Sequence, residues 1–578
     1  MLASIISKTS APIPQHRGRL WTPPWSEVPL LATTAQGQFD LLDPTQVETL
    51  RSLMEAAQRV VVWEVPYLFS NWSVRWHSVV STERVLCLGV EGVQETLIGA
   101  GQRYGLGPQS WSWSPDAPPW HQGASYSTRQ LAAQGLAEFQ ALCEVAQAQE
   151  QAIKQRDSQE FTRMVDEIVG PLEALHKRMT TRGVCIDPVK RRRLLDEAPV
   201  LLRGLKDRCA AIGISDPSDD MQVSAWAKRN GHEVSRSKTT WDDDLLKDLE
   251  RVAPGSGIEA VRRFRRLKSI TSGWIRGDLD GPDGRVHPIH IAFGQPTGRT
   301  QTLYPTVTGL PKELRPLVVA EEGYGLFEVD YEAAEIGVAG GLFRDERVRE
   351  VYAAGPAVAG IAQRLFPSRL ANVPLQEIKD QYRDDYNTAK VATYGSLYGM
   401  KATTLGRTIG RDAAAAHQIL GALATDVWPE VEQGLMKSVR RAARERRVEI
   451  TPGLFRAMPM IPADEAYRYV TIPRNTPIQG MCASVFRRAC LAVDAALRPY
   501  QGYIVLPMHD SLICAAPMAA RQEASIAVKE AMEAASEEEM GGFLRLRACI
   551  AMGQSGAWCK AGKEDSVKRL LQDPMYRI

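Results

Sequence analysis

The chain has 578 residues, which is enough for several domains of ordinary size. Hydrophobic residues make up 44% and charged residues 24%, and no run of eighteen apolar residues occurs, so we expect no membrane-spanning helix. With a net charge of only +2, any site for a polyanion must come from local clustering, and the nine cysteines contain no C-x-x-C pair of the kind that holds zinc.

Residues 1–150 are predicted to mix helices and strands in an α/β pattern. Residues 1–35 are rich in proline and are expected to be irregular. Between 40 and 100, the helical stretch VETLRSLMEAAQ alternates with apolar runs typical of strands, RVVVW and RVLCLGV. From 128 to 210 the pattern is that of long amphipathic helices, interrupted at TTRGVCIDP.

Four later segments have clear patterns. Residues 281–293 predict a turn followed by a strand, and residues 326–343 predict a strand that runs into a helix. Residues 376–398 predict one long helix. Residues 503–517 predict two strands joined by a tight polar turn.

Two aspartates stand at the ends of these apolar runs. Asp330 closes the first run, and Asp510 lies at the tip of the strand–turn–strand segment. An aspartate at a strand end is most often a turn former or a helix cap. Two such carboxylates on adjacent strands could instead hold a pair of Mg²⁺ ions that stabilise both oxygens of an in-line phosphoryl displacement. The strands alone leave both interpretations open.

Basic and aromatic residues provide two further candidates. Lys390, Tyr394 and Tyr398 are spaced four apart on one helix face, where a lysine could meet a triphosphate and a tyrosine could stack on a base. Spacing alone favours a core stripe with a solvated lysine. A basic cluster between 261 and 269 could bind phosphates or be a solvated helix face. The cluster consists of Arg262, Arg263, Arg265, Arg266 and Lys268.

Three motifs resemble those of family-A DNA polymerases, the family of bacterial DNA polymerase I. K-x3-Y-G-x2-Y-G at 390–399 resembles their fingers helix, DYEAAE at 330–335 their first palm motif, and MHDS at 508–511 their palm hairpin. One such motif is weak evidence for the family, but three motifs in the order of the family are strong evidence. Between roughly 165 and 561, further segments resemble the family. They are MTTRGVCID (179–187), DPSDDMQVSAWAKRNG (216–231), TGRTQT (297–302), TPGLFRAMP (451–459), RNTPIQGMCAS (474–484) and GQSGAWCKA (553–561).

The resemblance implies an α+β protein with the right-hand polymerase fold and the function of a DNA-dependent DNA polymerase. The palm would be an antiparallel sheet backed by helices, and the fingers and thumb would be helical. The expected boundaries are 1–150 for a shortened exonuclease-like domain, 151–284 for the thumb, 285–345 for the first part of the palm, 346–439 for the fingers and 440–578 for the second part of the palm with a C-terminal tail.

The resemblance also implies the catalytic residues. Asp330 and Asp510 would ligate two Mg²⁺ ions, with Mn²⁺ as a substitute and the backbone of Tyr331 as a further ligand. One ion would lower the pKa of the primer 3′-hydroxyl, and the other would neutralise charge on the pyrophosphate. Lys390 would pair with the incoming triphosphate and could protonate the leaving group.

Four residues are expected to contact the incoming nucleotide by the same resemblance. Tyr394 would stack near its sugar and base, and Tyr398 would close against the nascent base pair. Glu335 would act as a steric gate that rejects a 2′-hydroxyl. Tyr331 would lie beside the nucleotide.

The DNA contacts follow in the same way. Gln479 and Asn475 would read the minor groove, where acceptors occupy similar places in all four base pairs. Arg299, His509 and the basic cluster would hold the primer–template, mainly through phosphates and therefore without sequence preference.

Several positions depart from the pattern of the family. Tyr386 stands where the fingers helix normally has an arginine, and Ala359 where the preceding helix often has a phosphate-contacting histidine. Arg383, about two helical turns before Lys390, could bind the nucleotide in place of the missing arginine. Ser511 replaces the carboxylate that follows the H-D pair. With fewer triphosphate ligands, we expect weaker nucleotide binding or a distinct set of contacts.

The N-terminal region lacks the carboxylates with which relatives hold the metals of a proofreading 3′–5′ exonuclease. FDLLD at 39–43 has the wrong spacing, so its acids are expected to be caps or turn formers. WEVPY at 63–67 and YSTRQ at 126–130 stand at two other motif positions, and Gln130 replaces a metal ligand. We therefore predict a catalytically inactive exonuclease-like domain.

Two alternative functions stay open. A single-subunit RNA polymerase also carries H-D-S in its palm, but Glu335 and the lack of a promoter-binding domain argue against it. A non-catalytic nucleic-acid-binding protein on a polymerase scaffold would explain the missing phosphate ligands, whereas the retained Asp330, Asp510 and Lys390 argue against it.

The expected partners are primer–template DNA and dNTPs, without a membrane. The amphipathic tail SVKRLLQDPMYRI could bind a replisome or sliding-clamp protein, although a locally packed tail is the simpler interpretation. We expect the protein in the cytoplasm of a bacterium or of a phage-infected cell, in replication or repair.

Overall fold

The computed structural model describes most of the chain. The described residues are 1, 3–9, 15–16, 19–20, 27–41, 43–62, 64–65, 70–88, 100, 103–104, 106, 128–232, 241, 243–271, 280–303, 310–554 and 556–559. No helix within these ranges is both long enough and apolar enough to cross a membrane.

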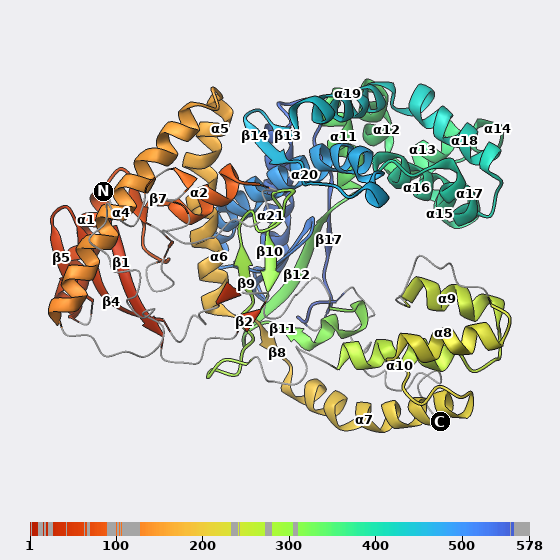
Figure 1. Cartoon of the computed structure of the whole chain (residues 1–578), viewed down its shortest axis with the longest axis horizontal. Coiled ribbons are helices and arrows are strands. Elements are labelled where there is room, and N and C mark those ends of the chain that lie inside the picture. The colour runs from red at the N-terminus through yellow and green to blue at the C-terminus, as the bar shows by residue number, and fades with distance from the viewer. Residues whose placement is uncertain are drawn as a thin grey trace.

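A four-stranded antiparallel sheet lies at the centre of the molecule (Figure 1). Its strands, in spatial order, are β15 (Tyr503–Met508), β16 (Ser511–Pro517), β12 (Tyr324–Tyr331) and β17 (Ala548–Ala551). The β15–β16 hairpin confirms the two strands predicted for 503–517, and α11 (Ala334–Phe343) follows β12 as predicted. In the register of the sheet, Asp330 lies opposite Ser511 on β16 and opposite Cys549 on β17.

Both faces of this sheet are buried, which explains why its strands are nearly continuous apolar runs. Successive residues of β16 alternate between two hydrophobic clusters. Leu512, Cys514 and Ala516 lie in a cluster that extends into the helices of 346–445, and Ile513 and Ala515 lie in one that extends into the helices of 188–270. The long helices α20 (Arg468–Leu497) and α21 (Arg521–Glu539) pack against each other and against this sheet.

The region expected to form the fingers consists of helices (Figure 1). They are α12 (Glu346–Ala354), α13 (Ala357–Leu365), α14 (Pro367–Leu370), α15 (Leu375–Gln381), α16 (Arg383–Leu397), α17 (Ala402–Ile409), α18 (Ala413–Ala422), the π-helix η8 (Leu423–Val427) and α19 (Pro429–Glu445). The single helix predicted for 376–398 is wrong in one respect. It is divided at Tyr382, whose φ of −122° and ψ of 51° are not helical.

The region expected to form the thumb is also mainly helical. Its helices are α5 (Gln159–Met164), the π-helix η4 (Val165–Val169), α6 (Gly170–Arg182), α7 (Pro188–Ala211), α8 (Asp220–Arg229), α9 (Asp243–Val252) and α10 (Glu259–Ile270). The interruption predicted at TTRGVCIDP is confirmed, since β8 (Cys185–Ile186) separates α6 from α7. Asp187 caps α7 by accepting the N–H groups of Val189 and Lys190, each at 3.0 Å.

Short hairpins and turns connect these parts. The strands are β9 (Ile289–Ile291) with β10 (Gln301–Leu303), β13 (Arg447–Thr451) with β14 (Leu454–Ala457), and β11 (Val318–Val319) with β8. The 3₁₀ turns are η7 (Lys312–Leu317), η9 (Ala463–Glu465) and η10 (Arg498–Tyr500). Strand β9 confirms the turn and strand predicted for 281–293, and β13–β14 encloses the TPG turn at 451–453.

The N-terminal region mixes strands and helices, as predicted. Its elements are β1 (Ala3–Thr9), β2 (Gln15–His16), β3 (Arg19–Leu20), β4 (Glu27–Thr34), β5 (Gly37–Asp40), α1 (Pro44–Ala56), β6 (Val60–Val62), β7 (Trp76–Ser78), α2 (Val79–Leu86) and α4 (Thr128–Lys154).

Two local predictions for this region are wrong. Residues 1–35 were expected to be irregular, yet β1 and β4 pair there and join β5 in an antiparallel sheet. The run RVLCLGV was expected to be a strand, but its first three residues end the helix α2. Helix α2 is buried on most sides, and a short apolar run of this kind cannot be distinguished from a buried strand by periodicity.

Two buried histidines lie where α6 packs on the β9–β10 hairpin. The ring centroids of His176 and His290 are 5.7 Å apart, and Nδ1 of His290 lies 3.1 Å from Oγ1 of Thr302. Burial lowers the pKa of His290 to about 3, and burial, with the nearby His290, holds the pKa of His176 well below its usual range. Both rings are therefore neutral in the folded protein at neutral pH.

We expect acid to destabilise the protein through these rings. A histidine of the unfolded chain takes up its proton near pH 6.5, but His290 in the folded protein does so only near pH 3. The stability contributed by the neutral ring is therefore complete above pH 6.5 and falls by about 1.4 kcal/mol per pH unit as the pH drops from 6.5 towards 3. Denaturant unfolding at several pH values should show a shallower acid dependence for His290→Gln than for wild type. The control is His417→Gln, which changes an exposed histidine and should keep the acid dependence of wild type. If the stability of His290→Gln fell with pH as steeply as that of wild type, the acid sensitivity would not come from His290.

Candidate active site

The two expected metal ligands lie at the same end of adjacent strands. Asp330 is the penultimate residue of β12, and Asp510 follows β15 in the turn to β16. The backbone N–H of Tyr331 donates to the carbonyl oxygen of Asp510 at 3.2 Å, which fixes the two segments against each other. His509 has a left-handed φ of 53°, which lets the chain reverse between the strands. The structure thus brings together the two aspartates that the sequence singled out.

The environment of Asp510 suits a cation. Burial raises the pKa of Asp510, and Glu335 raises it as well, whereas its own backbone N–H, His509 and Arg299 lower it. Among the described residues, no group of three or more His, Cys, Asp and Glu side chains is placed to hold a metal. An ion here would rely on two carboxylates, the Tyr331 carbonyl, water and substrate oxygens, which is how Mg²⁺ is usually held. This all-oxygen donor set fits Mg²⁺ or Mn²⁺.

A third carboxylate, Glu328, lies on β12 two residues before Asp330. It accepts hydrogen bonds from Ser511 Oγ at 3.1 Å and from Nε1 of the buried Trp558 at 2.9 Å, and it forms an ion pair with Arg315 at 3.4 Å. Ser511, which replaces a carboxylate of the family motif, is therefore held by a carboxylate from the neighbouring strand. Glu328 was not among the predicted site residues. The alternation F-E-V-D at 327–330 nevertheless indicates that Glu328 and Asp330 lie on the same side of the strand.

The fingers helix α16 carries the third part of the site. Lys390, Tyr394 and Tyr398 line one cavity of about 890 Å³ together with Lys401 and Tyr467. Lys390 is exposed there. Burial, followed by the Glu335 and Asp510 carboxylates, raises the pKa of Tyr394 to about 12, so this tyrosine lies near both carboxylates. The two tyrosines are half-buried and pack against the core on one side, while they line the cavity with the exposed Lys390.

Glu335 connects α11 to two other elements of the site. Its carboxylate forms an ion pair with Arg299 at 3.3 Å and accepts a hydrogen bond from the hydroxyl of Tyr398. Burial and this carboxylate raise the pKa of Tyr398, and a hydrogen bond with Gln479 opposes them. Four residues that the sequence singled out separately thus form one polar cluster.

Helix α20 presents the residues expected at the minor groove. Gln479 reaches the Tyr398 hydroxyl, as described above, and one turn earlier Oδ1 of Asn475 is buried without a hydrogen-bond partner among the described residues. A buried amide of this kind has unused hydrogen-bonding capacity, which is costly unless a ligand satisfies it.

The basic cluster on α10 contains both paired and exposed side chains. Arg262 donates to Glu250 at 2.7 Å, and Arg265 donates to Asp220 at 2.7 Å and to the carbonyls of Pro217 and Trp241. These two arginines therefore consolidate their own helical region. Arg263 is half-buried, whereas Arg266 and Lys268 are exposed, and Lys268 also donates to Ser218 at 2.8 Å.

The residues at the positions that differ from the family pattern lie in different environments. Ala359 is fully buried on α13, so its side chain packs in the core. Tyr386 is half-buried on α16, one turn before Lys390. Arg383 is the exposed first residue of α16 and does not line the cavity.

In the N-terminal region, Asp43 caps α1 by accepting the N–H of Thr45 at 2.9 Å, as predicted for the acids of FDLLD. WEVPY is described only at Glu64 and Val65, and YSTRQ only in its backbone from 128, so the Gln130 side chain lies outside the described residues.

Two buried acids, Glu83 in this region and Glu173 on the adjoining helix α6, carry no motif in the sequence. Glu83 on α2 accepts hydrogen bonds from Arg103 at 2.5 Å, Tyr104 at 2.9 Å and Gln149 at 2.6 Å. Glu173 on α6 accepts from the N–H of Val65 at 2.7 Å. Both carboxylates are thus satisfied by protein groups.

Comparison with known proteins agrees with this geometry. The family model described as DNA polymerase family A matches residues 219–557. The chain is 24% identical over 308 residues to DNA polymerase I of Lactococcus lactis subsp. lactis, covering 51% of this chain and 34% of that protein. It is 25% identical over 405 residues to the thermostable DNA polymerase I of Thermus filiformis, covering 65% of this chain and 47% of that protein. The matched part thus spans less than half of these relatives.

The fold resembles a solved structure over nearly its whole length. The POL domain of Pol1 from M. smegmatis, in complex with DNA primer-template and dNTP, superimposes with a TM-score of 0.77 at 18% identity, covering 96% of this chain and 95% of that one. The right-hand α+β polymerase fold expected from the motifs is therefore confirmed. Since the family model covers more than half of the residues, the chain belongs to DNA polymerase family A.

Proposed function

We propose that this protein is a DNA-directed DNA polymerase that extends a primer with dNTPs by two-metal nucleotidyl transfer. The observation that carries the proposal is the placement of Asp330 and Asp510 at adjacent strand ends. Asp510 lies near Tyr394, which lines a cavity together with Lys390 and Tyr398. A carboxylate pair that can hold metal ions, with a lysine in the neighbouring cavity, suits metal-assisted phosphoryl transfer.

The residues of the site fit the steps of this reaction. Bound to Asp330, Asp510 and the Tyr331 carbonyl, two Mg²⁺ ions would lower the pKa of the primer 3′-hydroxyl and neutralise charge on the departing pyrophosphate. Lys390 holds the triphosphate and donates a proton to the leaving group. Tyr394 stacks beside the sugar and base of the nucleotide.

Selection of the nucleotide is assigned to the polar cluster around Glu335. Its carboxylate is fixed by Arg299 and Tyr398, and a rigid acid at this place acts as a steric gate against a 2′-hydroxyl. Closure of α16 on a matched pair brings Tyr398 against the base.

The DNA would be held by contacts that do not depend on base sequence. Gln479 and Asn475 contact the minor groove, and His509 and Arg299 contact the primer–template. The exposed Arg266 and Lys268 of the thumb bind phosphates, and Arg262, Arg263 and Arg265 place and support this helix. In this proposal the thumb is 151–284, the palm 285–345 and 440–578, and the fingers 346–439.

We further propose that the N-terminal residues 1–150 have no exonuclease activity. One of the acids of FDLLD, Asp43, caps a helix, and the buried Glu83 accepts hydrogen bonds from protein donors, as does Glu173 on the adjoining helix α6. Residues 1–150 then act as a structural support. The amphipathic tail SVKRLLQDPMYRI, for which a locally packed segment is the simpler interpretation and clamp binding the alternative, lies outside the described residues.

A labelled primer on a DNA template tests both parts of the proposal. With dNTPs and Mg²⁺ we expect extension to the end of the template, and with Mg²⁺ alone we expect no shortening of the primer. Ribonucleotides should be incorporated poorly. Shortening without dNTPs would contradict the loss of proofreading. Tight primer–template binding without any extension would instead favour a non-catalytic binding protein.

A further inference from the structure

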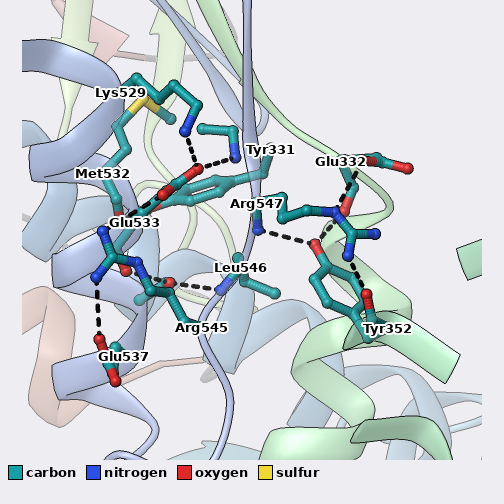
Figure 2. A network of polar contacts seen from close by, with 12 residues as sticks. Tyr331, Glu332, Tyr352, Lys529, Met532, Glu533, Glu537, Arg545, Leu546 and Arg547 are labelled. Carbon is teal, nitrogen blue, oxygen red and sulfur yellow. Dashed lines mark hydrogen bonds and ion pairs between the residues drawn. The ribbon is translucent and has the colours of Figure 1, made fainter. Parts of the chain in front are cut away.

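A network of polar contacts that includes Glu332, Tyr352 and Arg547 lies at the edge of the sheet, where β12 pairs with β17 (Figure 2). Arg547, which directly precedes β17, accepts the N–H of Glu332 on its carbonyl oxygen at 2.9 Å. Its Nε donates to the Glu332 carboxylate at 3.2 Å, and its two terminal nitrogens donate to the carbonyl oxygens of Tyr352 and Gly355. The guanidinium group also lies over the ring of Tyr352, 4.5 Å from its centroid.

This network joins the metal site to the first fingers helices. Glu332 directly follows Tyr331, whose carbonyl is the expected third metal ligand. Tyr352 lies near the end of α12, and Gly355 lies in the turn to α13. The Arg547 guanidinium is thus held between the strand end that carries Asp330 and the start of the fingers.

The network also faces the helix that carries Lys390. Tyr386 lies one turn before Lys390 on α16, and its pKa is raised by burial and then by the Glu332 carboxylate. The Glu332 carboxylate therefore lies near Tyr386, which is one helical turn from Lys390, and Arg547 donates a hydrogen bond to this carboxylate. Glu332 lies within the DYEAAE motif at 330–335 but was not among the predicted site residues, and no motif contains Arg547.

A triphosphate in this place needs more positive charge than Lys390 supplies. Arg299 is paired with Glu335, and Glu332 would repel phosphates unless a cation offset its charge. Arg547 is that cation. It uses three of its five N–H groups in the network, and 33% of its side chain is exposed, so it retains donors for a further ligand. A guanidinium group binds phosphate oxygens through two parallel hydrogen bonds.

We propose that Arg547 is a triphosphate-binding residue, which contacts the terminal phosphates of the incoming nucleotide from the palm while Lys390 contacts them from the fingers. This inference rests on the proposed function. Arg547, which precedes β17, supplies a positive charge that α16 lacks at Tyr386. The contacts to Glu332, Tyr352 and Gly355 hold the guanidinium in place before the nucleotide arrives, which lowers the entropy lost on binding.

Nucleotide binding without catalysis tests this assignment. The probe is the matched dNTP, titrated into the complex of the protein with a template and a dideoxy-terminated primer in Mg²⁺. Arg547→Gln should weaken dNTP binding roughly tenfold, and Arg547→Lys should retain part of the affinity. The matched control is Arg545→Gln, because Arg545 pairs with Glu533 at 3.3 Å and Glu537 at 3.4 Å and points away from Glu332 (Figure 2). Its affinity should stay within about twofold of wild type.

A second titration separates phosphate binding from a structural role. If Arg547 only held α12 and α13 in place, Arg547→Gln would weaken the matched dNTP and the matched dNMP to the same degree. We expect the loss for the dNTP alone, because the dNMP lacks the terminal phosphates. Equal losses, or a dNTP affinity equal to wild type, would overturn the assignment. Nucleotide binding that depends on Arg547 without primer extension would contradict the proposed function and leave this assignment standing.

Discussion

Primer extension by the Asp510→Ala variant is expected to be slower than wild type by at least about 10³-fold. Asp510 provides one of the two carboxylates at the sheet end, and its removal leaves Asp330 as the sole acid of the pair. A metal ion contributes several kcal/mol to a phosphoryl-transfer transition state, and about 4 kcal/mol corresponds to this factor. Single-turnover extension of a labelled primer at saturating dNTP measures the effect directly.

The matched control is Asp380→Asn, which removes an exposed carboxylate from the fingers helix α15 and should extend the primer as wild type does. Primer–template affinity and thermal unfolding should be close to wild type in both variants, because neither change removes a packed group. Extension by Asp510→Ala within tenfold of wild type would mean that the chemistry takes place elsewhere.

Arg474→Ala is expected to lower the free energy of unfolding by about 3–5 kcal/mol. The Arg474 side chain is 6% exposed, and its two terminal nitrogens donate to both oxygens of Glu432 at 2.7 Å and to the carbonyl of Ser396 at 2.7 Å. Truncation leaves a carboxylate and a carbonyl without their donor. Because these contacts join α20 to α19 and to the end of α16, equilibrium unfolding in denaturant should register the loss.

Two variants make this prediction specific. Arg498→Ala removes an ion pair with Asp494 at 3.2 Å, but the arginine side chain is 74% exposed, so the cost should be below about 1 kcal/mol. Replacing both members of the buried pair by Arg474→Met and Glu432→Leu should cost less than Arg474→Ala, since no charge is then left unpaired. A loss below about 1 kcal/mol in Arg474→Ala would show that water reaches the pair.

The central sheet and its two aspartates were predictable because their signals are local. The apolar runs around Asp330 and Asp510 each define a strand, and the turn MHDS defines a hairpin. The break at Tyr382 was not predictable, since the apolar spacing of 376–398 continues through it. The antiparallel pair β1–β4 was also missed, because its strands lie in a segment with many prolines and few periodic residues.

The partners of the site residues were harder to predict than the residues themselves. Glu328 is held by Trp558, 230 positions later in the chain, and Glu332 by Arg547, 215 positions later. The basic cluster appeared to be one uniform patch, but Arg262 and Arg265 take acidic partners from other helices. No spacing within a short window encodes such contacts, because they depend on how distant elements pack.

Side chains of β16 point alternately into two hydrophobic clusters, and this arrangement affects the order in which parts of the protein unfold. Neither the helices of 188–270 nor those of 346–445 have a core of their own that excludes this sheet. Loosening of either group exposes one face of the same strand, so the two should lose their protection from amide hydrogen exchange together. The backbone amides of β16 should then be the last to exchange, at the rate of global unfolding. Asp510, which directly precedes β16, and Asp330, which pairs with its first residue, are thus held by the most stable part of the protein.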